Sequence, residues 1–259
     1  MSEQRTHFDL VVIGGGPGGY ASALYGSAAG MDVALVEMSK IGGTCLHVGC
    51  IPAKELLETA SVLRTVRHAG EFGVNTSEAT LDLSKTMERK QSVIDQLTKG
   101  VVGLLDRREV TIFNGIGSLS ANRKIKIQAT DGSKTHITGD NIILASGSKP
   151  RTIPGFEIDG DLILTSEELL SMTTIPKSVA IIGGGAIGVE FASALNDFGS
   201  EVTILEALPS ILSGCDADLS KTVSRSFKKR GIEVLVNCKV SGHTKKTAGL
   251  TLHLDDRDI

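Results

Sequence analysis

The sequence has few cysteines, no large excess of positive or negative charge and no long apolar run. Each of these shortages excludes a class of protein. Four cysteines in 259 residues are too few for a secreted domain held together by disulfides. No apolar run approaches the roughly 20 residues that span a bilayer, and the opening MSEQRTHFDL lacks the apolar core of a signal peptide. We therefore expect a cytoplasmic protein without a membrane span, in a reducing compartment where a close cysteine pair is more often catalytic or metal-binding than structural.

The charged residues nearly balance, and the formal net charge is −3. This value gives no reason to expect a nucleic-acid partner. A hydrophobic fraction of 41% indicates a globular chain rather than a disordered one. The 30 glycines follow no regular period and stand beside only 6 prolines, which suggests tight turns near ligands.

The sequence does contain an internal repeat, in which one pattern occurs twice. An apolar run at 8–13 ends in GGGPGG, and a small-residue helix and a second strand at 32–37 follow. The run at 178–182 ends in GGGAIG and continues with a helix and a strand at 201–206. Each copy reads GxGxxG and closes on a carboxylate, Glu37 or Glu206, 23 positions after its first glycine (14 to 37, 183 to 206). The internal repeat predicts an α/β fold with two Rossmann-like units, each a parallel sheet with helices on its faces.

Each glycine of the pattern has a physical reason. The first permits a tight turn, the second lets the backbone approach a pyrophosphate, and the third lets helix and strand pack closely. The helix that follows presents unpaired N–H groups to the phosphates, and the acid is expected to accept hydrogen bonds from the adenosine ribose. The glycines concerned are Gly14, Gly16 and Gly19 in the first copy and Gly183, Gly185 and Gly188 in the second. One copy alone could be a plain strand–helix turn, but two complete copies predict two bound dinucleotides.

The segment between the copies is less informative. It predicts helices at 53–69 and 84–106 and strands at 110–113, 124–128 and 141–145. We expect a first domain at 1–149, which contains the cysteine pair, and a second at 150–259, each with one of the two dinucleotide sites.

The segment GGTCLHVGCIPAK carries the cysteine pair, Cys45 and Cys50. Its CxxxxC spacing fits no common zinc site, and there is no second ligand pair, so we expect no metal. Residues five apart in a regular helix have Cα atoms about 8.6 Å apart, beyond the roughly 6.8 Å that a disulfide tolerates. A disulfide therefore needs a distorted first turn, which the neighbouring glycines would permit, and it would be of the labile, catalytic kind. The alternative is two buried free cysteines. Cys215 and Cys238 have no such setting and are expected to be passive.

With both fingerprints, this segment resembles the GGTCxNxGCxPxK signature of the flavoprotein disulfide reductases, and it looks most like the members that oxidise dihydrolipoamide. His47 stands where asparagine is usual and Ala53 where serine is usual. The run Ala145-Ser146-Gly147 stands for the family's Ala-Thr-Gly near the flavin nucleotide. Gly117 matches a glycine whose backbone meets the adenine side of FAD.

The resemblance implies a role for each residue. The first fingerprint, Glu37 and the Gly43-Thr44 turn hold FAD, while the second fingerprint and Glu206 hold the nicotinamide nucleotide, with Val240 lining that site. Cys45 is the thiol that exchanges with the substrate, and Cys50 is the thiolate against the flavin. Lys54 lies near the flavin N5 and pairs with Glu190.

The four residues directly after Glu206, Ala-Leu-Pro-Ser, offer no arginine to accept a 2′-phosphate, which favours NAD over NADP. The resemblance therefore implies oxidation of protein-bound dihydrolipoamide through the Cys45–Cys50 disulfide and FAD, with hydride passed to NAD+. The implied partner is the lipoyl-bearing acyltransferase domain of a 2-oxoacid dehydrogenase complex, or the lipoyl protein of glycine cleavage.

Chains of the resembled family continue for roughly as many residues again. That further part supplies a dimerisation domain and, from the partner subunit, a His–Glu pair that acts as acid and base toward the dithiol. None of the six histidines here has a matching context, so we expect an N-terminal portion whose full-length form is a homodimer. Two other hypotheses are a flavoprotein with only NADH-acceptor (diaphorase-like) activity and a non-catalytic nucleotide-binding module.

Overall fold

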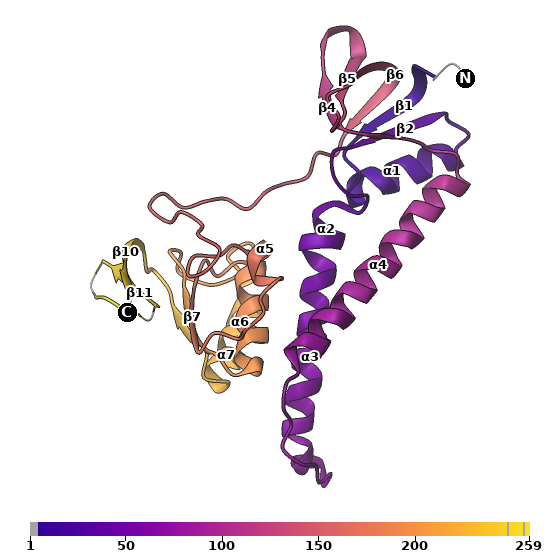
Figure 1. The fold of residues 1–259 in the computed structure, drawn as a ribbon. Coiled ribbons are helices and arrows are strands. Elements are labelled where there is room, and N and C mark those ends of the chain that lie inside the picture. The colour runs from indigo at the N-terminus through magenta and orange to yellow at the C-terminus, as the bar shows by residue number, and fades with distance from the viewer. Residues whose placement is uncertain (1–4, 248, 256) are drawn as a thin grey trace. The chain divides into compact units, whose positions relative to one another are not determined.

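The computed structural model describes residues 5–247, 249–255 and 257–259. The chain divides into two compact units, which we call the first unit (1–52 and 91–149) and the second unit (53–90 and 150–259). The divisions fall inside two long helices, α3 (Cys50–Arg67) and α4 (Leu83–Arg107), so each of these helices contributes to both units (Figure 1). The units divide after Lys149, and residues 53–90 pack with the second unit. The expected domains, 1–149 and 150–259, stay a prediction. Which nucleotide each unit takes stays a prediction.

The first unit is built on a six-stranded sheet. Its strands, in order across the sheet, are β3 (Thr111–Asn114), β2 (Val33–Glu37), β1 (His7–Ile13), β6 (Lys134–Leu144), β5 (Lys124–Gln128) and β4 (Ile116–Leu119). Strands β1, β2 and β3 are parallel, with Val12 opposite Leu35. The long strand β6 runs antiparallel to β5 over its first half and parallel to β1 over its second half. It therefore joins a three-stranded meander to the parallel sheet.

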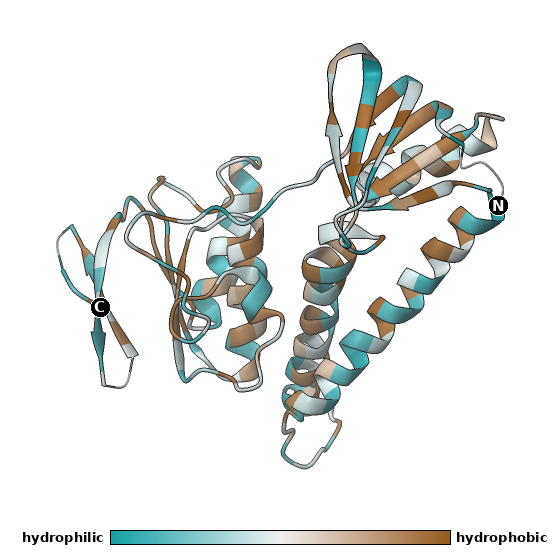
Figure 2. Cartoon of the chain, turned by 45° about the horizontal axis from the view of Figure 1, so that its top comes forward, coloured by the Kyte–Doolittle hydropathy of each residue, from teal (hydrophilic) through white to brown (hydrophobic). Residues whose placement is uncertain are grey.

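The two faces of this sheet bury separate apolar clusters. Alternate residues of β1 and β2 pack against the meander, where Ile125 and Ile137 are fully buried. The opposite residues pack against α1 (Pro17–Ala28) and the end of α4. Helix α1 buries only small residues, Gly19, Ala23 and Gly26, so its axis lies close to the strands. Figure 2 shows the resulting pattern, with apolar strands in this sheet and mixed polar and apolar residues along α4.

The second unit contains a three-stranded parallel sheet and a hairpin. The sheet has the order β7 (Ser178–Ile182), β8 (Glu201–Leu205) and β9 (Glu233–Leu235), with α6 (Ala186–Phe198) and α7 (Ala217–Lys229) as the connecting helices. Helices α6 and α7 bury their apolar residues against one face of it. The hairpin is β10 (Val240–Lys246) paired antiparallel with β11 (Gly249–Leu254), and it packs with Leu205 and Phe156. The short helix α5 (Ser166–Leu169) begins with a capping box between Thr165 and Glu168. Accepting the hydrogen bonds of that box lowers the pKa of the Glu168 carboxyl.

Three short elements complete the chain: helix α2 (Gly43–Val48) and the 3-10 turns η1 (Ala69–Phe72) and η2 (Ala121–Arg123). The α/β class expected from the sequence is confirmed, and most expected elements form within one or two residues of the expected bounds. Two differ more. The strand expected at 141–145 runs from Lys134 to Leu144, because its first half pairs with β5, and the helix expected from Ala53 starts at Cys50.

Candidate nucleotide and dithiol sites

The first fingerprint loop closes around its own backbone. Gly14 has a φ of +105°, a left-handed conformation that favours glycine. A Cβ placed on Gly19 would lie 1.6 Å from the Gly14 carbonyl oxygen, so the first turn of α1 can pack on the loop only with glycine at that position. The loop itself is tied to the sheet, because the Gly14 N–H donates to the Val36 carbonyl at 2.8 Å.

The second fingerprint loop repeats this geometry. Gly183 has a φ of +110°, and its N–H donates to the Leu205 carbonyl at 2.8 Å. A Cβ on Gly188 would lie 2.0 Å from the Gly183 carbonyl oxygen. The sequence repeat is thus a structural repeat. The first glycine of each loop is required by its left-handed backbone, and the third by the packing of the helix on the loop.

The middle glycines are not required in this way. Gly16 and Gly185 have extended backbones that any residue can adopt, with φ near −74° in both (−73° and −74°). A Cβ on Gly185 would meet nothing within 4 Å, and one on Gly16 would make only an ordinary contact at 3.8 Å. Neither residue caps its helix with a side chain, and neither helix has an acid in its first turn. The loops therefore leave open space beside exposed helix N–H groups, which fits a pyrophosphate.

The two acids clamp their loops by the same contacts. Glu37 is buried and accepts hydrogen bonds from the N–H groups of Gly15 at 2.5 Å and Ser39 at 2.7 Å. Glu206 accepts from Gly184 at 2.7 Å and Leu208 at 2.8 Å. The sequence predicted a role for both acids toward ribose and missed this contact with the loop. The 22-residue offset from the second residue of each glycine loop to its acid is the signal that the two copies share (15 to 37, 184 to 206).

The repeat also extends beyond the acid. The carbonyl of Gly15 accepts from the Gly42 N–H at 2.8 Å, and the carbonyl of Gly184 accepts from the Leu212 N–H at 2.7 Å. The residue before each donor, Ile41 or Ile211, is buried and lies against the same loop. The motif pattern gave no sign of this second tie, because the sequences that follow the two acids share little else.

In the first unit, this second tie brings the cysteine segment to the fingerprint. Gly43, the first residue of α2, has its Cα close enough to Gly16 that a Cβ on Gly43 would lie 2.6 Å from it. Thr44 is the next residue of α2. The ring of His47 donates from Nε2 to the Ile41 carbonyl at 2.8 Å, so this histidine stabilises the turn. The segment therefore starts against the space left by the middle glycine.

Cys45 and Cys50 lie on two successive helices rather than on one. Cys45 is half-buried in α2, and Cys50 is the exposed first residue of α3. Gly49 separates the helices, and a Cβ on it would lie 2.9 Å from the Thr44 carbonyl oxygen and 3.4 Å from the Cys45 Cα. The break between α2 and α3 is the kind of distortion that a disulfide at this spacing needs. The pairing of the two cysteines stays a prediction.

The second unit brings Lys54 and Glu190 together in an ion pair between α3 and α6. The sequence paired these residues only through the resemblance, since 136 positions separate them. The side chain of Lys54 is 58% exposed, so the ammonium remains accessible to a ligand. Its role beside a flavin stays a prediction.

The other expected site residues lie at the ends of strands. Ala145 follows β6, donates its N–H to the Ile13 carbonyl at 2.8 Å and packs on Gly14. Ser146 and Gly147 follow it, and Gly147 has a φ of +72°. Gly117 lies in β4, over the side chains of Ile13 and Val36. Val240 starts β10 and packs in the cluster at the carboxyl ends of β7 and β8. Their contacts with a nucleotide stay predictions.

No sequence pattern predicted the cluster of charged residues around Asp197. Asp197, near the end of α6, is only 7% exposed and pairs with Arg64 of α3 and Arg230 after α7. Charge patterns along a single helix could not predict it, because the three residues come from separate elements.

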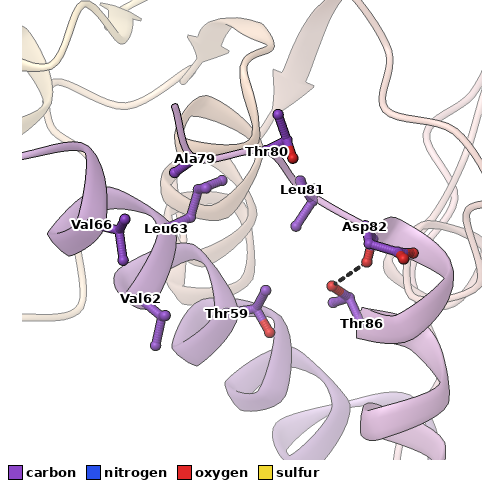
Figure 3. Close-up of a pocket in the computed structure, with 9 residues that line it drawn as sticks. All are labelled: Thr59, Val62, Leu63, Val66, Ala79, Thr80, Leu81, Asp82 and Thr86. Carbon is purple, nitrogen blue, oxygen red and sulfur yellow. Dashed lines mark hydrogen bonds between the residues drawn. The ribbon is translucent and has the colours of Figure 1, made fainter. Parts of the chain in front are cut away.

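A hollow of about 260 Å³ lies between α3 and the segment that leads into α4, and Figure 3 shows its lining. Its walls are mostly apolar or threonine side chains, and none of the expected site residues lines it. The Thr86 hydroxyl donates to the Asp82 carbonyl at 3.0 Å, where the segment joins the start of α4. Within the described ranges, no group of three or more His, Cys, Asp or Glu side chains could hold a metal ion. No helix among the described residues is long and apolar enough to cross a membrane.

The fold and the two loops define a class: an α/β protein with two dinucleotide cradles and a cysteine pair beside one of them. Comparisons with known proteins agree. The family model for pyridine nucleotide-disulphide oxidoreductases matches residues 8–259. The chain belongs to this family, and FAD and NAD(H) are the cofactors that the family uses.

Individual relatives point in the same direction. The dihydrolipoyl dehydrogenase of Bacillus subtilis (strain 168) is 41% identical over 243 residues, which cover 91% of this chain and 51% of that protein. The dihydrolipoyl dehydrogenase of Acholeplasma laidlawii is 41% identical over 238 residues, 90% of this chain and 69% of that protein. The crystal structure of LpdA from Mycobacterium tuberculosis superposes with a TM-score of 0.89 at 26% identity, over 98% of this chain and 56% of that one. The chain thus spans about half the length of the Bacillus and Mycobacterium proteins.

Proposed function

We propose that this chain is the nucleotide-binding and dithiol part of a dihydrolipoyl dehydrogenase, which oxidises protein-bound dihydrolipoamide and passes a hydride to NAD+. The observation that carries the proposal is the pair of middle glycines. Backbone conformation explains the first glycine of each loop and packing the third, but nothing among the described residues requires glycine at Gly16 or Gly185. A ligand that approaches the backbone at both positions does explain them. The 41% identity with dihydrolipoyl dehydrogenases supports the choice of substrate.

The proposed route starts with Cys45 and Cys50 joined as a disulfide. Dihydrolipoamide gives up two electrons and two protons, and its sulfur attacks the Cys45–Cys50 disulfide at Cys45. The attack forms a mixed disulfide with Cys45 and expels Cys50 as the thiolate that would face the flavin. The second substrate thiol then closes the lipoamide disulfide and releases Cys45, and the acid and base described below would take up the protons. Re-formation of the Cys45–Cys50 disulfide would release the electron pair again. FAD held by the first fingerprint and Glu37 would supply the acceptor for this pair, and NAD+ held by the second fingerprint and Glu206 would supply the final hydride acceptor.

The remaining residues would bind and orient. Gly14, Gly16, Gly19 and Glu37 would hold the FAD nucleotide, and the second fingerprint with Glu206 would hold NAD. The Glu206 carboxylate would repel a 2′-phosphate, which supports NAD over NADP. Lys54, held by Glu190, would place a positive charge beside the flavin and favour its reduced form.

The acid and base toward the dithiol would come from a His–Glu pair outside these residues, on the partner subunit of a homodimer. The partner in turnover would be a lipoyl-bearing acyltransferase domain of a 2-oxoacid dehydrogenase complex or a glycine cleavage protein. The 51% coverage of the Bacillus relative is consistent with that division of labour.

An anaerobic titration tests the route in this chain. The FAD-loaded protein is titrated with dihydrolipoamide, and the absorbance spectrum is followed. We expect a long-wavelength band at two-electron reduction, because a thiolate beside an oxidised flavin forms a charge-transfer pair. Cys50→Ser should lose the band.

The control is Cys215→Ser, which replaces an exposed cysteine outside the motif and should keep the band. A band that persists in Cys50→Ser would show that another thiol faces the flavin. A chain that binds no flavin under FAD supplementation would refute the route and leave a non-catalytic nucleotide-binding module.

A second candidate is an NADH-dependent reductase of artificial acceptors. The presence of both cradles within these residues favours it, because that activity needs no dithiol acid or base. Reduction of a dye by NADH, without lipoamide turnover, would support this candidate for the chain by itself.

A further inference from the structure

The contact between α3 and α6 has a charged group at each end and an apolar seam between them. Lys54 pairs with Glu190 near the start of both helices, and Arg64 pairs with Asp197 farther along both. The two helices therefore run in the same direction. The seam is made by the buried residues Leu56, Ala60 and Leu63 of α3 and Phe191, Ala194 and Phe198 of α6.

An apolar seam of this kind does not fix the axial register by itself. Its contacts are non-directional, and side chains of similar character recur about every turn along both helices. A shift by one turn, about 5.4 Å, would keep much of the apolar burial but would separate Lys54 from Glu190. Something directional has to select the register in which they meet.

The Asp197 cluster has that directional character. The carboxylate is 7% exposed and takes Arg64 Nη1 on Oδ2 at 2.5 Å and Arg230 Nη2 on Oδ1 at 3.0 Å. The Asp197 carbonyl, one of the last of α6, accepts from Arg67 Nη1 at 2.6 Å. Two arginines of α3, one turn apart, thus hold the end of α6 at a single residue.

Arg230 fixes the cluster from a third element. Its Nη1 donates to the Ser193 hydroxyl at 2.9 Å and its Nη2 to the Ser193 carbonyl at 2.8 Å. The negative end of the α6 dipole and the Asp197 charge would repel each other, and the two guanidinium groups offset both. A displacement of a few ångströms would separate this buried carboxylate from its guanidinium partners. The carboxylate would then be a charge without a partner, shielded from water, which is strongly destabilising.

We propose that Asp197, with Arg64 and Arg230, is a positioning residue that sets the register of α3 on α6 and so delivers Lys54 to Glu190. The Lys54–Glu190 pair gains its catalytic meaning from the function proposed above, on which the inference rests. Asp197 itself would contact neither substrate nor cofactor.

Zero-length cross-linking with a carbodiimide tests this in the 259-residue chain without any flavin. The reagent joins an amine and a carboxylate only when they are in contact, so the yield of the Lys54–Glu190 cross-linked peptide, measured by mass spectrometry, reports the register. We expect Asp197→Asn to lower the yield at least about threefold, because a buried ion cluster has lost its only anion. Glu190→Gln should abolish it and confirm the peptide assignment.

Arg89→Met is the matched control. Arg89 pairs with Glu55 and ties α3 to α4, so this variant also removes one ion pair from α3 but leaves the α6 contact intact. Its yield should stay within about 1.5-fold of the unsubstituted chain, because the substituted Arg89 side chain is 55% exposed and makes no contact with α6 in this pair. If both variants lower the yield equally, α3 has only become looser, and the positioning role is refuted.

Circular dichroism decides whether Asp197→Asn is folded. A folded Asp197→Asn chain with the original yield would overturn the proposal. If that variant does not fold, Arg64→Met takes its place, because Asp197 then keeps Arg230: a lowered yield supports the proposal and an unchanged yield overturns it. A chain that binds no FAD but loses the cross-link in Asp197→Asn would refute the proposed function and leave the positioning role standing.

Discussion

At the scale of single residues, the three glycines of each fingerprint do different work. The third glycine is a packing residue, since a Cβ on Gly188 would lie 2.0 Å from the Gly183 carbonyl oxygen. The middle glycine faces open space and has a backbone that alanine adopts freely. A methyl group added at Gly188 is therefore expected to affect folding, whereas one added at Gly185 is expected to affect binding.

Gly185→Ala should leave the free energy of unfolding unchanged or raise it by about 0.4–1 kcal/mol, because alanine has less freedom in the unfolded chain. It should also weaken NAD(H) binding by roughly tenfold or more, since the methyl group occupies the path of the pyrophosphate. Denaturant unfolding and a fluorescence titration with NADH measure the two effects.

Gly188→Ala provides the contrast. It should lower the free energy of unfolding by about 1–3 kcal/mol or more, because the loop has to move away from the helix. Equal loss of stability in both variants would contradict the division between a packing glycine and a ligand glycine.

The acids show a related division. Glu37 and Glu206 each hold two N–H groups of their own chain, so each fixes the shape of the loop before any ribose arrives. A carboxylate oxygen has two lone pairs, and those left over can still accept from a sugar hydroxyl. The acid is thus preorganised for binding by the contacts that stabilise the loop.

At the scale of elements, the break between α2 and α3 decides how the cysteines are presented. Gly49 allows the Thr44 carbonyl and the Cys45 backbone to approach the start of α3. A regular helix through this point would keep the thiols too far apart for a disulfide. The geometry of the dithiol therefore depends on a residue that carries no chemistry.

Gly49→Ala should shift the thiol–disulfide equilibrium of Cys45 and Cys50 toward the dithiol, because the added Cβ meets the Thr44 carbonyl oxygen at 2.9 Å and pushes the helices apart. The strain should also lower the free energy of unfolding by about 1–3 kcal/mol. Equilibration in glutathione buffers, followed by thiol alkylation and mass spectrometry, measures the shift. Gly70→Ala is the control, since a Cβ there meets nothing within 4 Å. An unchanged equilibrium in Gly49→Ala would mean that the break has no influence on the pair.

The tie between α4 and α5 involves a buried cation. Lys90 is 8% exposed and donates to the Leu170 carbonyl at the end of α5. Burial removes water from the ammonium and lowers the pKa of Lys90 below its usual value of 10.5. The positive charge is therefore less well stabilised in the folded chain than in the unfolded one.

The sign of the pH dependence follows from linkage. Between the lowered pKa of folded Lys90 and the value of 10.5 for the unfolded chain, the unfolded state binds more protons, so stability from this group rises with pH. Compared with Lys90→Met, which lacks the titrating group, the original chain should gain free energy of unfolding between pH 7.5 and pH values near 10. Urea unfolding of both proteins at the two pH values checks the difference. A difference that stays constant or reverses would show that burial does not perturb this lysine.

At the scale of the whole molecule, each of the two units contains one copy of the same loop design. Each holds a complete cradle, with turn glycine, open glycine, packing glycine and clamped acid, inside its own residues. The cysteine segment belongs to the first unit, and the Lys54–Glu190 pair to the second. Helix α3 carries both Cys50 and Lys54, so one helix links the thiol chemistry of one unit to the ion pair of the other along the chain.

The local elements and the motifs could be predicted from the amino-acid sequence alone. Period, glycine spacing and β-branched runs are local signals, and they predicted the strands β1, β2, β7 and β8, the helices α1 and α6, and the positions of both acids. The family resemblance added the Lys54–Glu190 pair across 136 positions, which no local pattern could supply.

Only the tertiary structure decided the contacts between residues remote in sequence. It showed that both acids clamp their own loops, that β6 joins the meander to the parallel sheet, and that residues 53–90 pack with the second unit. It also assembled Asp197 with Arg64 and Arg230. The reason is physical: hydrogen bonds and ion pairs between elements depend on how their faces meet, and a sequence pattern specifies each face but not its partner.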